Sequence, residues 1–172
     1  MSKTPLTPYP PDPDEDASPD ADSGDLVDVI ARDRDWANQR SVRFSARRVE
    51  FVRCRFTGAE LAEASISDAR FDDCRLDLAG LRHAKLERVT FRDCPMAECD
   101  FHGAVLKDVV FERCELREAV FSAARLDRVE FRGCDLTALS GAEALRGARM
   151  PWNDVLANAA LFAAVVGIEV VE

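Results

Sequence analysis

Several patterns that carry common chemistry are scarce in this 172-residue sequence. It has only two histidines, His83 and His102, no glycine-rich loop ahead of a helix, and no Cys-x-x-Cys pair. A nucleophile with its base, a phosphate loop and a zinc site therefore lack the residues that would build them. We expect no catalytic residue, no cofactor and no metal ion, and hence no enzymatic activity.

Long apolar runs and clustered basic residues are also missing. No segment stays apolar for the roughly 20 residues that a membrane-spanning helix needs. No basic stripe marks a surface for direct contact with nucleic acid, and the N-terminus lacks the apolar centre of a secretory signal. We expect a cytoplasmic protein that contacts neither membranes nor nucleic acid directly.

Residues 1–25 form the first segment, which is acidic and rich in proline. They carry seven acids against one lysine and almost no large apolar residues, so burial cannot offset the entropy of ordering them. We expect a disordered acidic tail. A tail of this kind either keeps the protein soluble or serves as an interaction arm.

Between residues 49 and 138 a large apolar residue recurs every five positions, eighteen times in succession. A small residue stands two positions before each of them. This period matches neither a helix nor a flat strand, so the segment is a repeat array. The large positions are Phe51, Phe56, Leu61, Ile66, Phe71, Leu76, Leu81, Leu86, Phe91, Met96, Phe101, Leu106, Phe111, Leu116, Phe121, Leu126, Phe131 and Leu136.

A second period of twenty residues lies over the first. Every fourth large residue from Phe51 to Phe131 is phenylalanine, and five of the six cysteines recur at the same interval from Cys54 to Cys134. Four five-residue sides per coil predict a square solenoid, with about 4.8 Å between coils that pair through their backbones. Such an array needs a cap at each end.

The sequence resembles the pentapeptide repeat proteins, whose unit is a small residue, any residue, a central Leu or Phe, and two further residues. The resemblance implies an all-β solenoid over residues 49–150, a right-handed quadrilateral β-helix with the central and small residues pointing inward. It also implies a capping helix at the C-terminus and homodimers that join at that end.

All six cysteines occupy the small inward position. No histidine cluster accompanies them, and parallel side chains in one column are poorly oriented for a disulfide. We therefore predict buried free thiols that act as small apolar residues. Metal binding or redox chemistry is the alternative.

Outward positions that are twenty residues apart alternate in charge. Opposite charges on neighbouring coils attract, so we expect ion-pair ladders along the surface. Three columns show the pattern: Asp68, Arg88, Asp108 and Arg128; Asp72, Arg92, Glu112 and Arg132; and Glu87, Lys107 and Asp127.

Both flanks of the array depart from its pattern. Residues 26–48 are predicted as a lead-in cap, in which Leu26, Val29 and Ile30 form a short turn or helix. Trp36 is in phase with the large positions, whereas Phe44 is out of phase by two residues. After Leu136 the register breaks, which predicts one last, distorted coil.

Residues 151–172 are predicted as a C-terminal cap, with a helix from Pro151 to about Val166 and a short strand after Gly167. One helix face would close the solenoid. The other carries an apolar stripe that either forms a dimer interface or is covered by the terminal strand. The candidate interface residues are Ala157, Leu161, Ala164 and Val165.

The predicted function is that of a rigid interaction scaffold whose protein partner the sequence does not name. The alternative is a mimic of DNA that binds or protects DNA gyrase, as the fluoroquinolone-resistance branch of the family does. A mimic needs a continuous negative field, whereas residues 49–138 hold 18 acids and 14 bases that interrupt the acidic columns. The ladders thus weaken the gyrase hypothesis.

Overall fold

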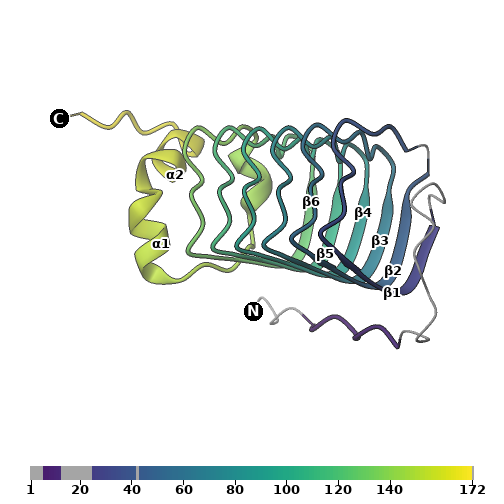
Figure 1. The fold of residues 1–172 in the computed structure, drawn as a ribbon. Helices are drawn as coiled ribbons and strands as arrows, with labels where there is room; N and C mark the ends of the chain where they lie inside the picture. The colour runs from purple at the N-terminus through teal and green to yellow at the C-terminus, as the bar shows by residue number, and fades with distance from the viewer. Residues whose placement is uncertain (1–5, 13–24, 42, 172) are drawn as a thin grey trace.

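The structure is a computed structural model that describes residues 6–12, 25–41 and 43–171. In these residues the chain forms a solenoid with two short helices at its C-terminal end (Figure 1). The elements are β1 (Asp25–Arg32), β2 (Ser45–Val52), β3 (Ser65–Asp72), β4 (Lys85–Arg92), β5 (Val105–Glu112), β6 (Arg125–Arg132), the 3-10 helix η1 (Ala142–Leu145), α1 (Trp152–Ala157) and α2 (Ala159–Val165).

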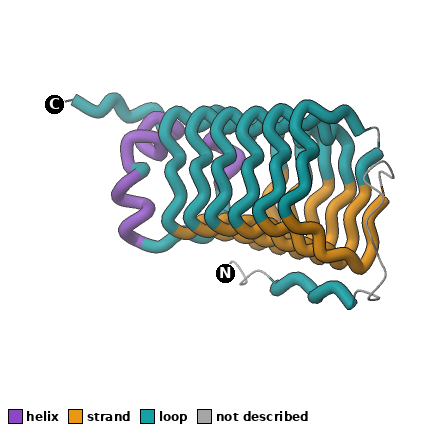
Figure 2. The backbone as a smooth tube through the Cα atoms, in the orientation of Figure 1, coloured by secondary structure: helices purple, strands orange, loops and turns teal. Residues whose placement is uncertain are grey.

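The strands stack in sequence order into one parallel six-stranded sheet. Each residue pairs with the one twenty positions later, as in Asp25 with Ser45 and Val105 with Arg125. The remaining sides of each coil are joined by single bridges, such as Glu60 with Gly80. Figure 2 shows the strands along one edge of the solenoid and loops along the others. The predicted twenty-residue coil is confirmed.

The coils turn at residues in the left-handed region of backbone conformation, which recur every five positions. Asp68 has φ 52° and Leu78 has φ 61°, and each lies two residues after an inward large side chain. Only a few of these corners are glycine, although a side chain other than glycine is strained there. Stacking on neighbouring coils therefore imposes the corner conformation.

The core consists of the columns predicted from the sequence. The rings of Phe51, Phe71, Phe91, Phe111 and Phe131 stack on one another, with centroids 4.6 to 5.2 Å apart. The small residues beside them are buried as well. Offset stacking of this kind adds to the free energy that burial supplies.

The N-terminal coil differs from the expected lead-in cap. Leu26, Val29 and Ile30 belong to β1, which pairs in full register with β2, so the prediction of a turn or helix is wrong. Pairing between β1 and β2 gives the backbone N–H and C=O groups at this end of the solenoid their hydrogen-bond partners. The solenoid thus begins at Asp25 instead of residue 49.

In the interior of the same coil, a large and a small residue stand in each other's columns. Trp36 occupies the large position, as predicted, and its ring stacks 5.0 Å from that of Phe56. Phe44 stands in a column of small residues, while Ala46 stands in a column of large ones, and both are buried. Exchanging a small and a large residue between neighbouring columns conserves core volume, which packing tolerates best.

Residues 6–12 differ from the expectation of a disordered tail. They are extended and lie beneath the strands, alongside the solenoid (Figures 1 and 2). Their backbone N–H groups donate to carboxylates of three different coils. The other residues of the predicted tail, 1–5 and 13–24, lie outside the described residues.

The C-terminal cap contains two helices where one was predicted. α1 and α2 are separated by Asn158, whose φ of −107° interrupts the helix. The Asn158 side chain donates to the Asp154 carbonyl oxygen at 2.8 Å and is buried at this break. Residues 168–171 are exposed and form no strand, so the predicted terminal strand is wrong. Its short apolar stretch has no neighbouring strand to pair with.

The last coil is distorted, as the broken register predicts. Glu130 bridges to Arg149, which is one residue short of the regular interval. The 3-10 helix η1 takes up the difference and begins after Gly141, which has φ 77°. A Cβ atom at Gly141 would lie 2.3 Å from the Ser122 backbone nitrogen. The coil can therefore close only around a residue without a side chain.

We expect Gly141→Ala to destabilise the fold by about 2 to 4 kcal/mol, because it adds a backbone clash to left-handed strain. The matched control is Gly147→Ala, where φ is 84° but nothing lies within 4 Å of the added atom. That variant should lose about 1 kcal/mol. Guanidinium unfolding measures both, and equal losses would contradict close approach as the cause.

Candidate interaction surfaces

Arginine side chains form the most regular contacts on the solenoid surface. In six pairs, Nε and Nη2 of an arginine both donate to the carboxylate of the aspartate twenty residues earlier. Every one of these arginines therefore reaches back toward the preceding coil. The pairs are Arg48 with Asp28, Arg53 with Asp33, Arg55 with Asp35, Arg88 with Asp68, Arg113 with Asp93, and Arg128 with Asp108.

Three of these pairs stand in one column, which we call the corner ladder. It consists of residues 28, 48, 68, 88, 108 and 128, which lie at the middle corners of β1 to β6 and have positive φ. Its aspartates alternate with its arginines, which confirms the predicted column from Asp68 to Arg128 and extends it to Asp28. Asp108 is 1% exposed and Asp68 is 6% exposed. The ladder is thus partly buried instead of fully solvated.

The other two predicted columns pair only in part. Lys107 donates to Glu87 at 2.9 Å, and Arg92 lies 3.3 Å from Glu112, as expected. Arg132, however, pairs with Glu130 of its own strand at 2.8 Å. Residues two apart on a strand share a face, so a partner within the coil competes with the partner on the next coil.

The corner ladder lowers the pKa values of its carboxyl groups. Hydrogen bonds from Arg128 lower the pKa of Asp108 despite the opposing effect of burial, and the Leu6 N–H adds to the effect. Burial raises the pKa of Asp68, but hydrogen bonds from Arg88 and the Tyr9 N–H outweigh it and the net shift is downward. Both carboxyl groups are thereby held ionised at neutral pH.

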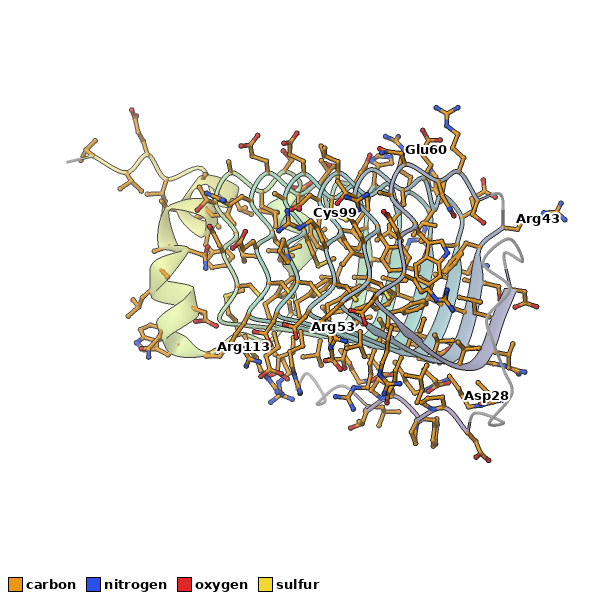
Figure 3. All side chains as sticks on the ribbon, in the orientation of Figure 1. Asp28, Arg43, Arg53, Glu60, Cys99 and Arg113 are labelled. Atoms are coloured by element: carbon orange, nitrogen blue, oxygen red, sulfur yellow. The ribbon has the colours of Figure 1, made fainter. Side chains whose placement is uncertain are left out.

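Exposed charged side chains outside the corner ladder lie on opposite edges of the solenoid. Figure 3 shows Arg53 and Arg113 along the edge nearest residues 6–12, with Asp28 at its end, whereas Glu60 lies on the opposite edge. Arg53 and Arg113 each hold a carboxylate at 2.6 to 2.8 Å. On this edge each of these two arginines therefore neutralises the aspartate that it holds.

The two histidines lie side by side. The His83 and His102 rings meet edge to face with centroids 5.6 Å apart. Asp100 accepts from Arg82 at 3.0 Å and from the His102 backbone N–H at 2.8 Å. Within the part of the chain that the structure describes, no three His, Cys, Asp or Glu side chains are grouped to hold a metal ion.

The cysteines are buried free thiols, as predicted. In the main column each thiol donates to a carbonyl oxygen of the preceding coil, for example Cys74 to Phe51 at 3.3 Å and Cys94 to Phe71 at 3.4 Å. Burial raises the pKa of the Cys99 thiol. These contacts identify the cysteines as packing residues whose weak donors are satisfied inside the core.

A second surface lies at the C-terminal end, where large apolar side chains are exposed. Trp152 is 71% exposed and Val166 is 70% exposed. No helix among the described residues is long and apolar enough to cross a membrane. We call this set the C-terminal apolar surface: Trp152, Leu156, Val165, Val166, Ile168, Val170 and Val171.

The predicted interface residues fall partly on this surface. Ala157, Ala164 and Val165 are exposed, as expected. Leu161 is half-buried and packs against the core instead of facing outward. A wheel for one continuous helix cannot place it correctly, because the break at Asn158 rotates α2 relative to α1. Trp152, the first residue of α1, is exposed and does not cover the solenoid end.

Comparisons with known proteins agree with this repeat geometry. The family model described as "Pentapeptide repeat region" matches residues 44–121. A pentapeptide repeat protein from the thylakoid lumen of Arabidopsis thaliana is 22% identical, with 57% of this chain and 68% of that chain covered and a TM-score of 0.54. This likeness shows the shared fold. A search of curated proteins found no match.

Two other solved structures are less similar. QnrB1, a plasmid-mediated fluoroquinolone resistance protein, is 19% identical, with 84% of this chain and 99% of that chain covered and a TM-score of 0.38. HetL, involved in heterocyst differentiation regulation in the cyanobacterium Nostoc sp. strain PCC 7120, is 20% identical over 69% and 68% of the two chains, with a TM-score of 0.41. Neither alignment bears on the function of this chain.

We expect Asp108→Asn to lower stability at pH 7 by about 1 to 2 kcal/mol, because the charge-assisted hydrogen bonds of a buried carboxylate are lost. The pKa of Asp108 is lower in the folded state, so its contribution is present above the unfolded pKa of about 3.9. It disappears as the pH falls through the folded pKa. The difference between the variant and the wild type should therefore narrow below about pH 3.9.

Urea unfolding of both proteins across that pH range measures this difference. The control is Asp73→Asn, which changes an exposed aspartate and should alter stability by no more than about 0.5 kcal/mol. A gap for Asp108→Asn that stays constant down to pH 2 would contradict ionisation of the ladder as its source.

Proposed function

The chain has a pentapeptide repeat region over residues 44–121 and the fold of a pentapeptide repeat protein, and on that premise we propose that it acts as a rigid, non-enzymatic scaffold that presents its outer faces to a protein partner. The observation that carries the proposal is the exposure of apolar side chains at one end of a stiff rod. Among the residues that the structure describes, seven of the twelve exposed large apolar side chains lie between residues 152 and 171. Concentrated apolar exposure of this kind marks interaction sites.

The paired ladders support a role in presentation. Arginines held by two hydrogen bonds to a neighbouring coil, such as Arg53 on Asp33 and Arg113 on Asp93, are partly ordered before any partner arrives. Ordering side chains at an interface costs about 0.5 to 1.5 kcal/mol for each flexible residue. A surface that is already ordered avoids much of that cost. Buried free thiols suit a reducing compartment, which supports action in the cytoplasm.

The C-terminal apolar surface is best suited to a second copy of this chain. A homodimer joined end to end would cover Trp152, Leu156 and Val166 on both subunits in one contact. An interface that is apolar and self-complementary is typical of permanent homodimers. It would also double the length of the scaffold while leaving both sets of ladders free.

We expect Leu156→Asp with Val166→Asp to convert a dimer of twice 19.1 kDa into a monomer, because burying two unpaired carboxylates per subunit opposes association. Light scattering after size-exclusion chromatography measures the mass. The matched control is Leu78→Asp, which changes a side chain that is also 55% exposed but lies on a solenoid corner. A monomeric wild type would reject the dimer, as would a double variant that remains dimeric.

Gyrase binding by mimicry of DNA is the second function that the family suggests. A mimic must present unbroken negative charge, as phosphates do. Here each of six aspartates that face outward is covered by an arginine. The charge pattern therefore favours the scaffold over the mimic.

We expect the wild-type protein at micromolar concentration to leave DNA supercoiling by purified gyrase unchanged, because its acidic columns are neutralised. The comparison is Arg53→Gln with Arg113→Gln, which uncovers two acidic positions on one edge. Inhibition by this variant alone would support the charge argument. Inhibition by the wild type, or protection from a fluoroquinolone, would assign gyrase as the partner.

A further inference from the structure

The docked segment, residues 6–12, meets the corner ladder in a repeating way. The backbone N–H of Leu6 donates to Asp108 Oδ1 at 3.0 Å, that of Tyr9 to Asp68 Oδ1 at 3.2 Å, and that of Asp12 to Asp28 Oδ1 at 3.4 Å. The contacts thus recur at every third residue of the segment and at every second coil of the solenoid. In all three contacts the acceptor is the Oδ1 atom of an aspartate.

Each of these oxygens also accepts from an arginine. Asp108 Oδ1 is 2.6 Å from Nε of Arg128, and Asp68 Oδ1 is 2.6 Å from Nε of Arg88. A carboxylate oxygen has two lone pairs and accepts both bonds. The arginine fixes the carboxylate so that its second lone pair faces the docked segment. The ladder is therefore a row of acceptors that are already in position.

The spacing of these acceptors matches the polyproline II helix. Three residues of that helix advance by about 9.3 Å, and two coils of the solenoid advance by about 9.6 Å. The helix has three residues per turn, so every third N–H points to the same side. An extended strand would advance by about 10 Å in three residues, but successive side chains would alternate between faces. The polyproline II geometry fits both the distance and the direction.

The sequence of the segment carries the same period. Prolines stand at positions 5, 8 and 11, directly before the three residues whose N–H groups donate. Pro8 is buried, although its neighbours Thr7 and Tyr9 are exposed. Proline favours the polyproline II backbone and leaves the donors to the residues that follow it. The repeat Pro-x-x therefore encodes the spacing of the acceptors.

One side-chain contact adds to the backbone contacts. The guanidinium carbon of Arg88 lies 5.8 Å from the centre of the Tyr9 ring, within the range of a cation–π interaction. The same guanidinium holds Asp68. Arg88 therefore has two roles. It holds the carboxylate that accepts from the Tyr9 N–H, and its guanidinium lies over the Tyr9 ring.

The docked segment is held by little apart from these contacts. Leu6 is 57% exposed and Tyr9 is 65% exposed, so the segment buries few large side chains. It is covalently joined to β1 through the chain, and covalent linkage supplies a high local concentration. A segment held only by its high local concentration and by backbone hydrogen bonds can be displaced by another peptide whose N–H groups have the same spacing.

We propose that the corner ladder is a binding site for proline-rich peptides of the form Pro-x-x repeated, with a free N–H after each proline, and that residues 6–12 occupy it until such a segment of a partner protein displaces them. Recognition rests on carboxylates fixed by arginines, one for every three residues of peptide. This surface is separate from the C-terminal apolar surface, and its role does not depend on dimerisation.

Hydrogen exchange of the full-length protein tests the docked state. Because their N–H groups are hydrogen-bonded, the amides of Leu6 and Tyr9 should exchange at least about tenfold more slowly than that of Thr7. Asp68→Ala with Asp108→Ala should abolish this difference because it removes both acceptors, whereas the control Asp93→Ala, in another column, should preserve it. Equal exchange of the three amides in the wild type would overturn the proposal.

Displacement is tested with a fluorescein-labelled peptide of residues 4–13 as the probe. Leu6→Pro with Tyr9→Pro in the full-length protein removes two donors from the tethered segment and keeps its polyproline preference. This variant should bind the probe about tenfold or more tightly than the wild type does, because the tethered competitor is lost. A probe carrying the same two prolines should not bind.

Two further results decide the proposal. Loss of probe binding when Asp68→Ala and Asp108→Ala are added to the proline variant supports the ladder as the site. Asp28→Ala in the proline variant should weaken probe binding by a smaller factor. Circular dichroism shows that each variant is folded. Probe binding that survives these changes overturns the proposal. Exchange protection that rises with protein concentration also overturns it, since the segment would then come from a second copy.

Discussion

The pairing of each coil with the coil twenty residues earlier is the constraint on which the whole structure depends. It places Phe51 beneath Phe71 and Cys74 beneath Cys94, so that residues of one kind form continuous columns. It also holds side chains other than glycine at left-handed corners. A single residue of slippage would misplace every column at once, which makes the register highly specific.

The same register turns the surface into an ordered array. Since outward positions also repeat every twenty residues, an aspartate in one coil faces an arginine in the next. Pairs such as Asp33 with Arg53 are exposed and contribute little to stability. Asp108, in contrast, is almost fully buried. Charge pairs that look alike in the sequence therefore differ in their surroundings, and the buried ones define where a ligand meets fixed acceptors.

The interior was predictable from the sequence, because large and small residues alternate with a strict period and nothing competes with it. Trp36 could be placed by phase alone. The coil formed by β1 was missed because Phe44 and Ala46 exchange sizes, and only the packed structure shows that their volumes compensate. The helix break at Asn158 was missed for a related reason, since a buried side-chain hydrogen bond sets it. The docking of residues 6–12 does not follow from composition, because a high content of proline and acids predicts disorder, whereas docking depends on prolines spaced every three residues.

The arginines of the six pairs that are joined by two hydrogen bonds all point back toward coils made earlier in the chain. Each coil likewise adds its strand to the one before it. A chain built this way can grow from its N-terminal end as it leaves the ribosome, with every finished coil serving as the template for the next. Residues 6–12 are an exception, because Leu6 binds Asp108 in the fifth coil. A segment that precedes every coil in the chain is thus among the last to find its place.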